Sequence, residues 1–190
     1  MAGRNFLFVP GPTNVPDRVT RSMLIPMEDH RSSKFPELSR SLFADLKRVF
    51  QSRDGEVFIF PSTGTGAWEA ALVNTLSPGD RVLAPRFGQF SHLWIDMMQR
   101  LGLDVQVIDV EWGEGAPEAR IGEILREDRA HRIKGVMVVH NETATGVTSD
   151  IAAVRRAMDN AGHPALIARR SPCDLSSVGS SMRWLCSLCP

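Results

Sequence analysis

The stretch Phe60-Pro-Ser-Thr-Gly-Thr-Gly-Ala-Trp-Glu-Ala-Ala-Leu72 decides the fold, because a short apolar run ends there in a glycine turn and a helix-like segment follows at once. A strand that delivers small residues to a helix start leaves backbone N–H groups at the positive end of the helix dipole. The hydroxyls of Thr63 and Thr65 can add hydrogen bonds, while Gly64 and Gly66 let the backbone come close to a ligand. The stretch therefore suits a phosphate group.

Two nucleotide-binding motifs compete with this interpretation. A P-loop ends in Gly-Lys-Ser/Thr, and the stretch contains no lysine. The dinucleotide fingerprint Gly-x-Gly-x-x-Gly fails because Glu69 occupies its last glycine position. A tight strand–helix turn that binds nothing is the remaining alternative, so residues elsewhere in the chain must decide.

Strand-like and helix-like segments alternate along the chain. We expect strands at 56–60, 81–84, 104–110 and 135–140, and helices at 36–50, 67–76, 91–101, 118–128 and 150–161. This alternation predicts an α/β fold with a mostly parallel sheet flanked by helices. Three prolines in residues 4–16 predict an extended N-terminal arm.

Two further stretches follow expected strands, at the sheet end where α/β folds bind ligands. Arg86–Ser91 places Phe90 between a glycine and a helix, where its ring can lie over a flat ligand or pack in the core. His140–Gly146 brings His, Asn, Glu and two Thr to the end of an apolar strand. The alternative for that stretch is a hydrogen-bonded turn with Gly146 at positive φ.

The composition is that of an ordinary globular protein, with 43% hydrophobic and 23% charged residues among 190. The formal net charge is zero, so we expect no nucleic-acid partner. No apolar run approaches the roughly 20 residues of a membrane span, and the N-terminal one is too short for a secretory signal. The three cysteines, Cys173, Cys186 and Cys189, gather at the end, so the body needs no disulfide. We expect a cytoplasmic protein without a metal site.

In combination, these stretches resemble the class V, fold-type-I aminotransferases that use pyridoxal phosphate (PLP), most closely the serine–glyoxylate and alanine–glyoxylate aminotransferase group. The resemblance covers nearly all of residues 5–166, and its specificity comes from the ordered set of motifs. The matching stretches are FVPGPTNVP (8–16), EDHRSS (28–33), FPSTGTGAWEAALVNTLSPGDRV (60–82), FGQFSHLWID (87–96), VHNETATGVTSDI (139–151) and HPAL (163–166).

The resemblance implies a role for each matched residue. Thr63, Gly64 and Thr65 match the cup for the PLP phosphate, and Phe90 matches the aromatic that stacks on the pyridine ring. Thr143 matches the residue near the cofactor's phenolic oxygen. Segments near the substrate entrance and the dimer contact are matched by Pro10, Gly11, Asn14, His30 and Arg31. A homodimer or tetramer is implied, as in the family.

The resemblance stops after Leu166. The family continues with a buried strand that ends in the aspartate facing the pyridinium nitrogen, and later with Gly-Ser-Gln-Lys, whose lysine bonds to the cofactor. Here Arg169 and Arg170 stand where that strand should continue, which is costly for unpaired charges. Asp174 is a match for the aspartate only in a displaced register. The lysines of this chain, Lys34, Lys47 and Lys134, stand in no matching context.

We therefore expect an arm over 1–35, the N-terminal part of an incomplete PLP-binding large domain over 36–166, and a divergent tail over 167–190 that reflects a frameshift or a truncation. The implied function is transfer of an amino group from serine or alanine to glyoxylate through PLP, on a small amino acid and a 2-oxo acid. Without the lysine, we expect no catalytic residue and no turnover by the chain alone. The alternatives are a non-catalytic truncated fragment that associates with an intact subunit, and a nucleotide-binding module.

Overall fold

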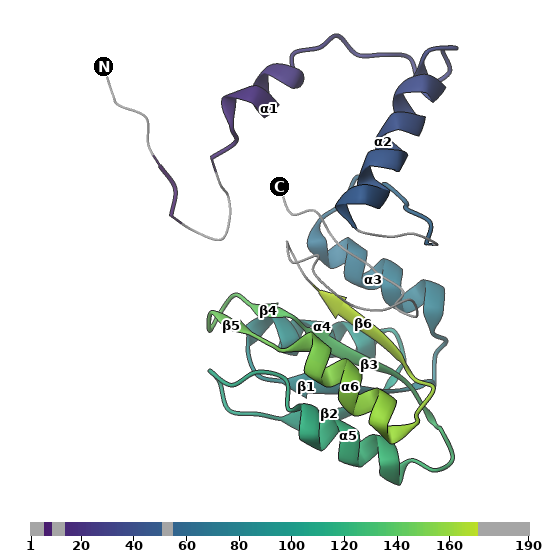
Figure 1. The fold of residues 1–190 in the computed structure, drawn as a ribbon, viewed down its shortest axis with the longest axis vertical. Helices are drawn as coiled ribbons and strands as arrows, with labels where there is room; N and C mark the ends of the chain where they lie inside the picture. Colours follow the sequence, from purple (N-terminus) through teal and green to yellow (C-terminus); the bar gives the residue numbers. More distant parts are fainter. Residues whose placement is uncertain (1–5, 9–13, 51–54, 171–190) are drawn as a thin grey trace. The chain divides into compact units, whose positions relative to one another are not determined.

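The computed structural model describes residues 6–8, 14–50 and 55–170 (Figure 1). The chain divides into two compact units, with the boundary between Pro61 and Ser62. The domain limits expected at residues 35 and 166 stay predictions.

The described residues of the first unit include two helices, α1 (Asp17–Ser22) and α2 (Phe35–Val49). Helix α2 confirms the expected helix at 36–50, and its early proline suits the fixed φ of a first helical turn. Helix α1 was not predicted. An acidic residue in its first turn and a basic one in its last turn interact favourably with the helix dipole. Within the described part of the proposed arm, residues 6–8 and 14–16 form neither helix nor strand.

The strand expected at 56–60 is wrong. Residues 55–60 belong to none of the strands in the described part of the chain. The side chains of Phe58 and Phe60 are 74% and 70% exposed, and their rings stack on each other at 6.5 Å. A strand needs a neighbouring strand to complete its hydrogen-bond ladder, and a short apolar run does not supply that neighbour by itself.

The second unit is built on a four-stranded sheet in the order β2-β1-β3-β6. Its strands are β1 (Arg81–Arg86), β2 (Asp104–Asp109), β3 (Ile133–Val139) and β6 (Leu166–Arg170). Every pairing between them is parallel, which confirms the predicted α/β class. The central strands β1 and β3 are buried along most of their length, as continuous apolar strands in parallel sheets are.

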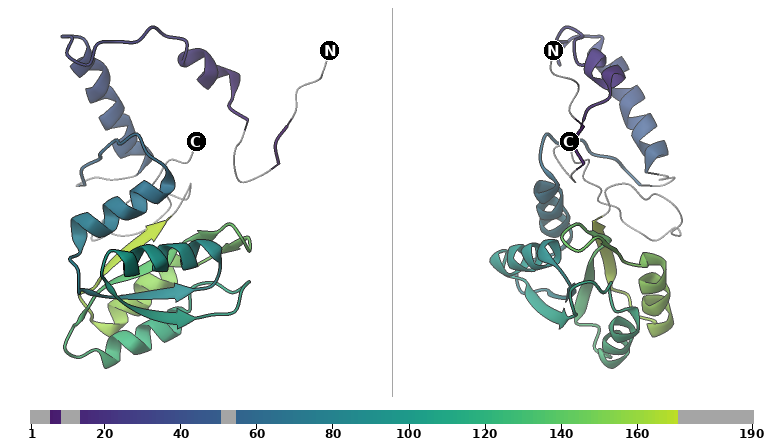
Figure 2. Two further views of the ribbon diagram at one scale, coloured as in Figure 1. Left: turned by 180° about the vertical axis from the view of Figure 1, so that it is seen from behind. Right: turned by 90° about the vertical axis from the view of Figure 1, so that its left-hand side faces the viewer.

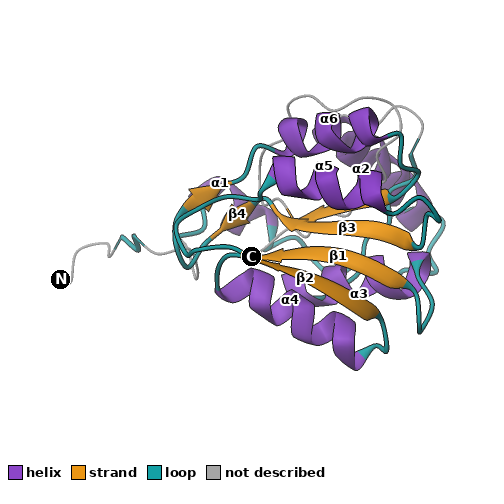
Figure 3. Cartoon of the chain, turned by 90° about the horizontal axis from the view of Figure 1, so that it is seen from below, coloured by secondary structure: helices purple, strands orange, loops and turns teal. Residues whose placement is uncertain are grey.

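Helices cover both faces of this sheet (Figures 2 and 3). Helices α3 (Gly64–Thr75) and α4 (Gln89–Arg100) lie on one face, and α5 (Glu118–Glu127) and α6 (Ile151–Ala161) lie on the other. Helices α5 and α6 pack closely where Gly122 meets Ala157. The core therefore lies between the sheet and its two helical layers. Its fully buried side chains include Leu72, Leu83, Phe87, Met98, Ile121, Leu125, Met137 and Met158.

The sequence also contains clear signals for the ends of these elements. Asp150 caps α6 as predicted, because its carboxylate accepts a hydrogen bond from the Ala153 N–H at 2.8 Å, and Gly162 ends the helix at φ +63°. A short antiparallel hairpin, β4 (Asn141–Glu142) with β5 (Val147–Thr148), follows β3 and turns through Gly146 at φ +74°. In the described residues, no helix is both long and apolar enough to cross a membrane.

Candidate functional site at the carboxyl end of the sheet

The carboxyl end of the sheet brings three loops together. Strands β1 and β3 are parallel neighbours, so the loop that carries Phe90 and the loop that carries Thr143 leave the same edge. The Glu142 carboxylate accepts a hydrogen bond from the Phe90 N–H at 3.2 Å and so joins these two loops. The start of α3 reaches the same place, because Trp68 packs edge-to-face on Phe90 with ring centroids 6.3 Å apart.

The start of α3 is suited to an anion. Thr63 is extended, with φ −92° and ψ 173°, but its side chain makes no capping hydrogen bond, and the first turn carries no acidic residue. The N–H groups of a first helical turn have no acceptor within the helix. Thr63 and Thr65 are exposed, whereas Gly64 is buried. An approaching phosphate would meet these N–H groups, two hydroxyls and the positive end of the dipole, so the local chemistry fits the phosphate of PLP.

Phe90 belongs to a row of aromatic rings. It is partly buried, its edge-to-face neighbour is Trp68, and Trp68 in turn stacks on Trp94 with ring centroids 5.5 Å apart and planes 20° from parallel. Both tryptophans are almost completely buried. The row therefore packs Phe90 of α4 against Trp68 of α3, and an aromatic ring held in this way can stack on a flat ligand.

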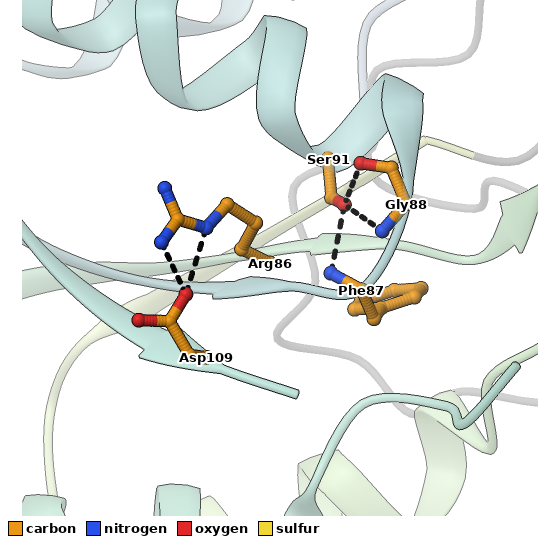
Figure 4. A network of polar contacts seen from close by, with 5 residues as sticks. All are labelled: Arg86, Phe87, Gly88, Ser91 and Asp109. Atoms are coloured by element: carbon orange, nitrogen blue, oxygen red, sulfur yellow. Dashed lines mark hydrogen bonds and ion pairs between the residues drawn. The ribbon is translucent and has the colours of Figure 1, made fainter. Parts of the chain in front are cut away.

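Helix α4 begins on a dense set of polar contacts (Figure 4). The Ser91 hydroxyl accepts hydrogen bonds from the N–H groups of Phe87 and Gly88, at 3.0 and 2.9 Å. In the same figure Arg86, at the end of β1, pairs with Asp109 at the end of β2 through Nε and Oδ1 at 2.7 Å. These contacts hold the chain in a fixed path from β1 into α4.

Glu142 completes the start of α4 from another part of the sequence. Its carboxylate is fully buried and accepts hydrogen bonds from the N–H groups of Phe90 and Ser91, at 3.2 and 3.0 Å. It also accepts one from the Ala144 N–H of its own turn at 3.2 Å. The N-cap residue of α4 is Gly88, which has no side chain, so Glu142 supplies the acceptor that a capping side chain would normally provide.

The predicted site residues fall into three groups. Thr63, Gly64, Thr65, Phe90 and Thr143 lie on the three loops that meet in the second unit. Asn14, His30 and Arg31 are exposed and belong to the first unit, where the Asn14 side chain accepts a hydrogen bond from the Leu7 N–H at 2.6 Å. Pro10, Gly11 and Asp174 lie outside the described residues.

The opposite end of the sheet carries a separate polar cluster. His163 is buried, its Nε2 lies 3.3 Å from Asp128 Oδ2, and its Nδ1 accepts a hydrogen bond from the Ala165 N–H. Burial raises the pKa of the Asp128 carboxyl, but hydrogen bonds from the backbone of Ile133 and Arg132 and the contact with His163 outweigh it and hold that pKa below its usual value. This cluster lies where β3 begins, away from the three loops.

Comparison with known proteins assigns the chain to a family. The model of the family described as aminotransferase class-V matches residues 5–168. The chain belongs to the class-V aminotransferases. Members of this family depend on PLP in general, which agrees with an anion site and an aromatic wall at the carboxyl end of the sheet.

Individual class-V relatives agree with this assignment. The chain is 64% identical over 178 residues to serine–glyoxylate aminotransferase of Methylorubrum extorquens. The matched region covers 94% of this chain and 44% of that protein. It is 52% identical to L-aspartate–glyoxylate aminotransferase of Paracoccus denitrificans, over 95% of this chain and 45% of that protein. The crystal structure of alanine–glyoxylate aminotransferase from Nostoc superposes with a TM-score of 0.78 at 28% identity, over 94% of this chain and 46% of that one. The chain thus spans less than half the length of these relatives.

Sequence reasoning missed the part played by Glu142. The His140–Gly146 stretch was recognised as polar, but no role could be assigned to this glutamate within it. Two local signals were available: a helix that begins after a glycine, which cannot cap it, and an acidic residue directly after a buried strand. Only the pairing of β1 with β3 brings the two signals to one place.

Proposed function

We propose that this chain forms the part of a class-V aminotransferase that binds the phosphate and the ring of PLP. The observation that carries the proposal is that α3, whose start has no side-chain cap, packs against the ring of Phe90 through Trp68. In this proposal Thr63, Gly64 and Thr65 bind the phosphate, and Phe90 stacks on the ring. Thr143 forms a hydrogen bond with the phenolic oxygen. When bound, PLP supplies an electron-withdrawing ring that stabilises negative charge at the α-carbon of an amino acid.

The proposed reaction of the whole enzyme is transfer of an amino group from serine or alanine to glyoxylate. The high identity to a serine–glyoxylate aminotransferase supports this substrate pair, with serine as the first donor to test. We also propose a cytoplasmic location, with which a body that needs no disulfide is compatible. We also propose a homodimer or tetramer in which Pro10, Gly11, Asn14, His30 and Arg31 contribute to the entrance of a site at the subunit contact.

The binding function is tested with pyridoxamine 5′-phosphate, which has the ring and phosphate of the cofactor but no aldehyde to react with surface amines. The 190-residue chain is expected to bind it saturably in calorimetry, and Phe90→Ala should weaken that binding about tenfold, the loss of one stacked aromatic. Inorganic phosphate should compete with it. A chain that binds ATP or NAD in preference would support the nucleotide-binding alternative and overturn the proposal.

The second candidate is a fragment that binds the cofactor without catalysing a reaction. It is favoured by the position of Lys134, which lies in β3 next to its first residue and therefore at the sheet end opposite Phe90. We expect the chain to yield no hydroxypyruvate from serine and glyoxylate in the presence of PLP. Turnover that disappears in Lys34→Ala, Lys47→Ala or Lys134→Ala would contradict this and assign the lysine.

A further inference from the structure

The function proposed above assigns no role to the buried Glu142 carboxylate. This carboxylate nevertheless contacts both loops that flank the proposed ring site. One of its oxygens accepts hydrogen bonds from the N–H groups of Phe90 and Ala144, and the other accepts one from the N–H group of Ser91. Glu142 and Thr143 are adjacent in the chain, and Phe90 lies 52 residues earlier. One side chain therefore connects the residue proposed to stack on the ring with the residue proposed to bind its oxygen.

The fit of Glu142 at this place is tight. A methyl group at Gly88 would overlap the Glu142 side chain, so the glycine leaves room for the carboxylate to reach the first turn of α4. The positive end of the α4 dipole stabilises the negative charge there. The start of α4 is capped by this carboxylate, whereas α3 has neither a side-chain cap from Thr63 nor an acidic residue in its first turn.

We propose that Glu142 is a positioning residue for the cofactor ring: by capping α4 it holds Phe90 at the height and angle at which the ring stacks. This inference rests on the proposed PLP site and adds to it a residue that does not touch the ligand. It predicts that loss of Glu142 affects binding of a ring-bearing ligand and spares binding of a phosphate alone.

The test replaces the glutamate with its neutral isostere. In Glu142→Gln one carboxylate oxygen becomes an NH₂ group, which cannot accept a hydrogen bond, so at least one N–H group at the start of α4 or in the turn loses its acceptor in either orientation of the amide. We expect the Kd for pyridoxamine 5′-phosphate to rise about tenfold, the size of one lost charge-assisted hydrogen bond, and the Kd for inorganic phosphate to stay within about twofold.

The matched control is Asp128→Asn, which also removes a carboxylate that accepts backbone hydrogen bonds, but at the opposite end of the sheet. It should lower stability and leave the affinities for both ligands unchanged. A double-mutant cycle then shows whether Glu142 acts through Phe90. In the Phe90→Ala background, Glu142→Gln should weaken pyridoxamine 5′-phosphate no further.

The outcomes separate the two proposals. If the unaltered chain binds neither ligand, the proposed PLP site is wrong and the positioning role falls with it. Two results would overturn only the positioning role, provided that the unaltered chain binds both ligands. In the first, Glu142→Gln binds pyridoxamine 5′-phosphate as well as the unaltered chain does. In the second, Glu142→Gln raises the Kd by the same factor in the Phe90→Ala background as in the unaltered chain. Should Glu142→Gln not fold, Glu142→Asp, which keeps the charge but shortens the reach, is expected to give the same ring-specific loss.

Discussion

Gly88 illustrates why a glycine can be needed for space and not for conformation. Its φ of 174° is extended backbone that any residue adopts, but a Cβ would overlap the buried Glu142 side chain. We expect Gly88→Ala to lower the free energy of unfolding by about 1–3 kcal/mol, the usual cost of overpacking, in urea denaturation. Gly115→Ala is the control: its added methyl would have no neighbour nearer than 3.5 Å, so a change within about 0.5 kcal/mol is expected. Equal effects would contradict the steric account.

At the scale of the element, α6 depends on a cap that the sequence predicts. Asp150 accepts the Ala153 N–H at 2.8 Å, and the helix ends in a left-handed glycine. Asp150→Ala is expected to cost about 1 kcal/mol of stability, measured by urea unfolding, because one first-turn N–H loses its acceptor. Asp150→Ser, which can still accept that hydrogen bond, should recover most of the loss. If serine is no better than alanine, capping is not what the aspartate contributes.

The same scale shows where reasoning from the sequence was wrong. The apolar run at 56–60 predicted a strand, but Phe58, Ile59 and Phe60 are exposed, and the segment joins no sheet in the described residues. Helices α3 and α4 begin at Gly64 and Gln89, earlier than the expected Ala67 and Ser91. Gly64 and Gly66 have low helix propensity, which hid the start of α3 in the sequence. The start of α4 is stabilised by the Ser91 hydroxyl and by the distant Glu142 carboxylate.

At the scale of the whole molecule, stability should depend on pH through Asp128. This carboxylate joins the end of α5 to the first residue of β3 and to His163, which precedes β6. Burial acts to raise its pKa, but hydrogen bonds from Ile133 and Arg132 and the His163 contact prevail, so the folded pKa lies below the usual 3.8. A lowered pKa stabilises the fold above the unfolded value, and that contribution is lost as the pH falls through the folded pKa.

We therefore expect the free energy of unfolding to fall as the pH drops from about 5 towards 3, and to fall less steeply in Asp128→Asn. Urea titrations at a series of pH values measure the two slopes. The variant should be less stable than the parent at pH 7, where the carboxylate is ionised, and the two should converge in acid. Parallel curves would mean that Asp128 contributes no proton-linked stability.

The sequence by itself determined the family and three strands of the main sheet, β1, β2 and β3, because these depend on local patterns. It did not predict that β6 runs on through Arg169 and Arg170. Buried apolar runs, caps such as Asp150 and the glycine turn before α3 act over a few residues, and their order matches the class-V aminotransferases. Only the tertiary structure decided how the loops meet. The strand order puts β1 beside β3, and a buried carboxylate needs hydrogen-bond donors. Glu142 finds them at the start of α4, 51 and 52 residues earlier, a distance that no local pattern spans.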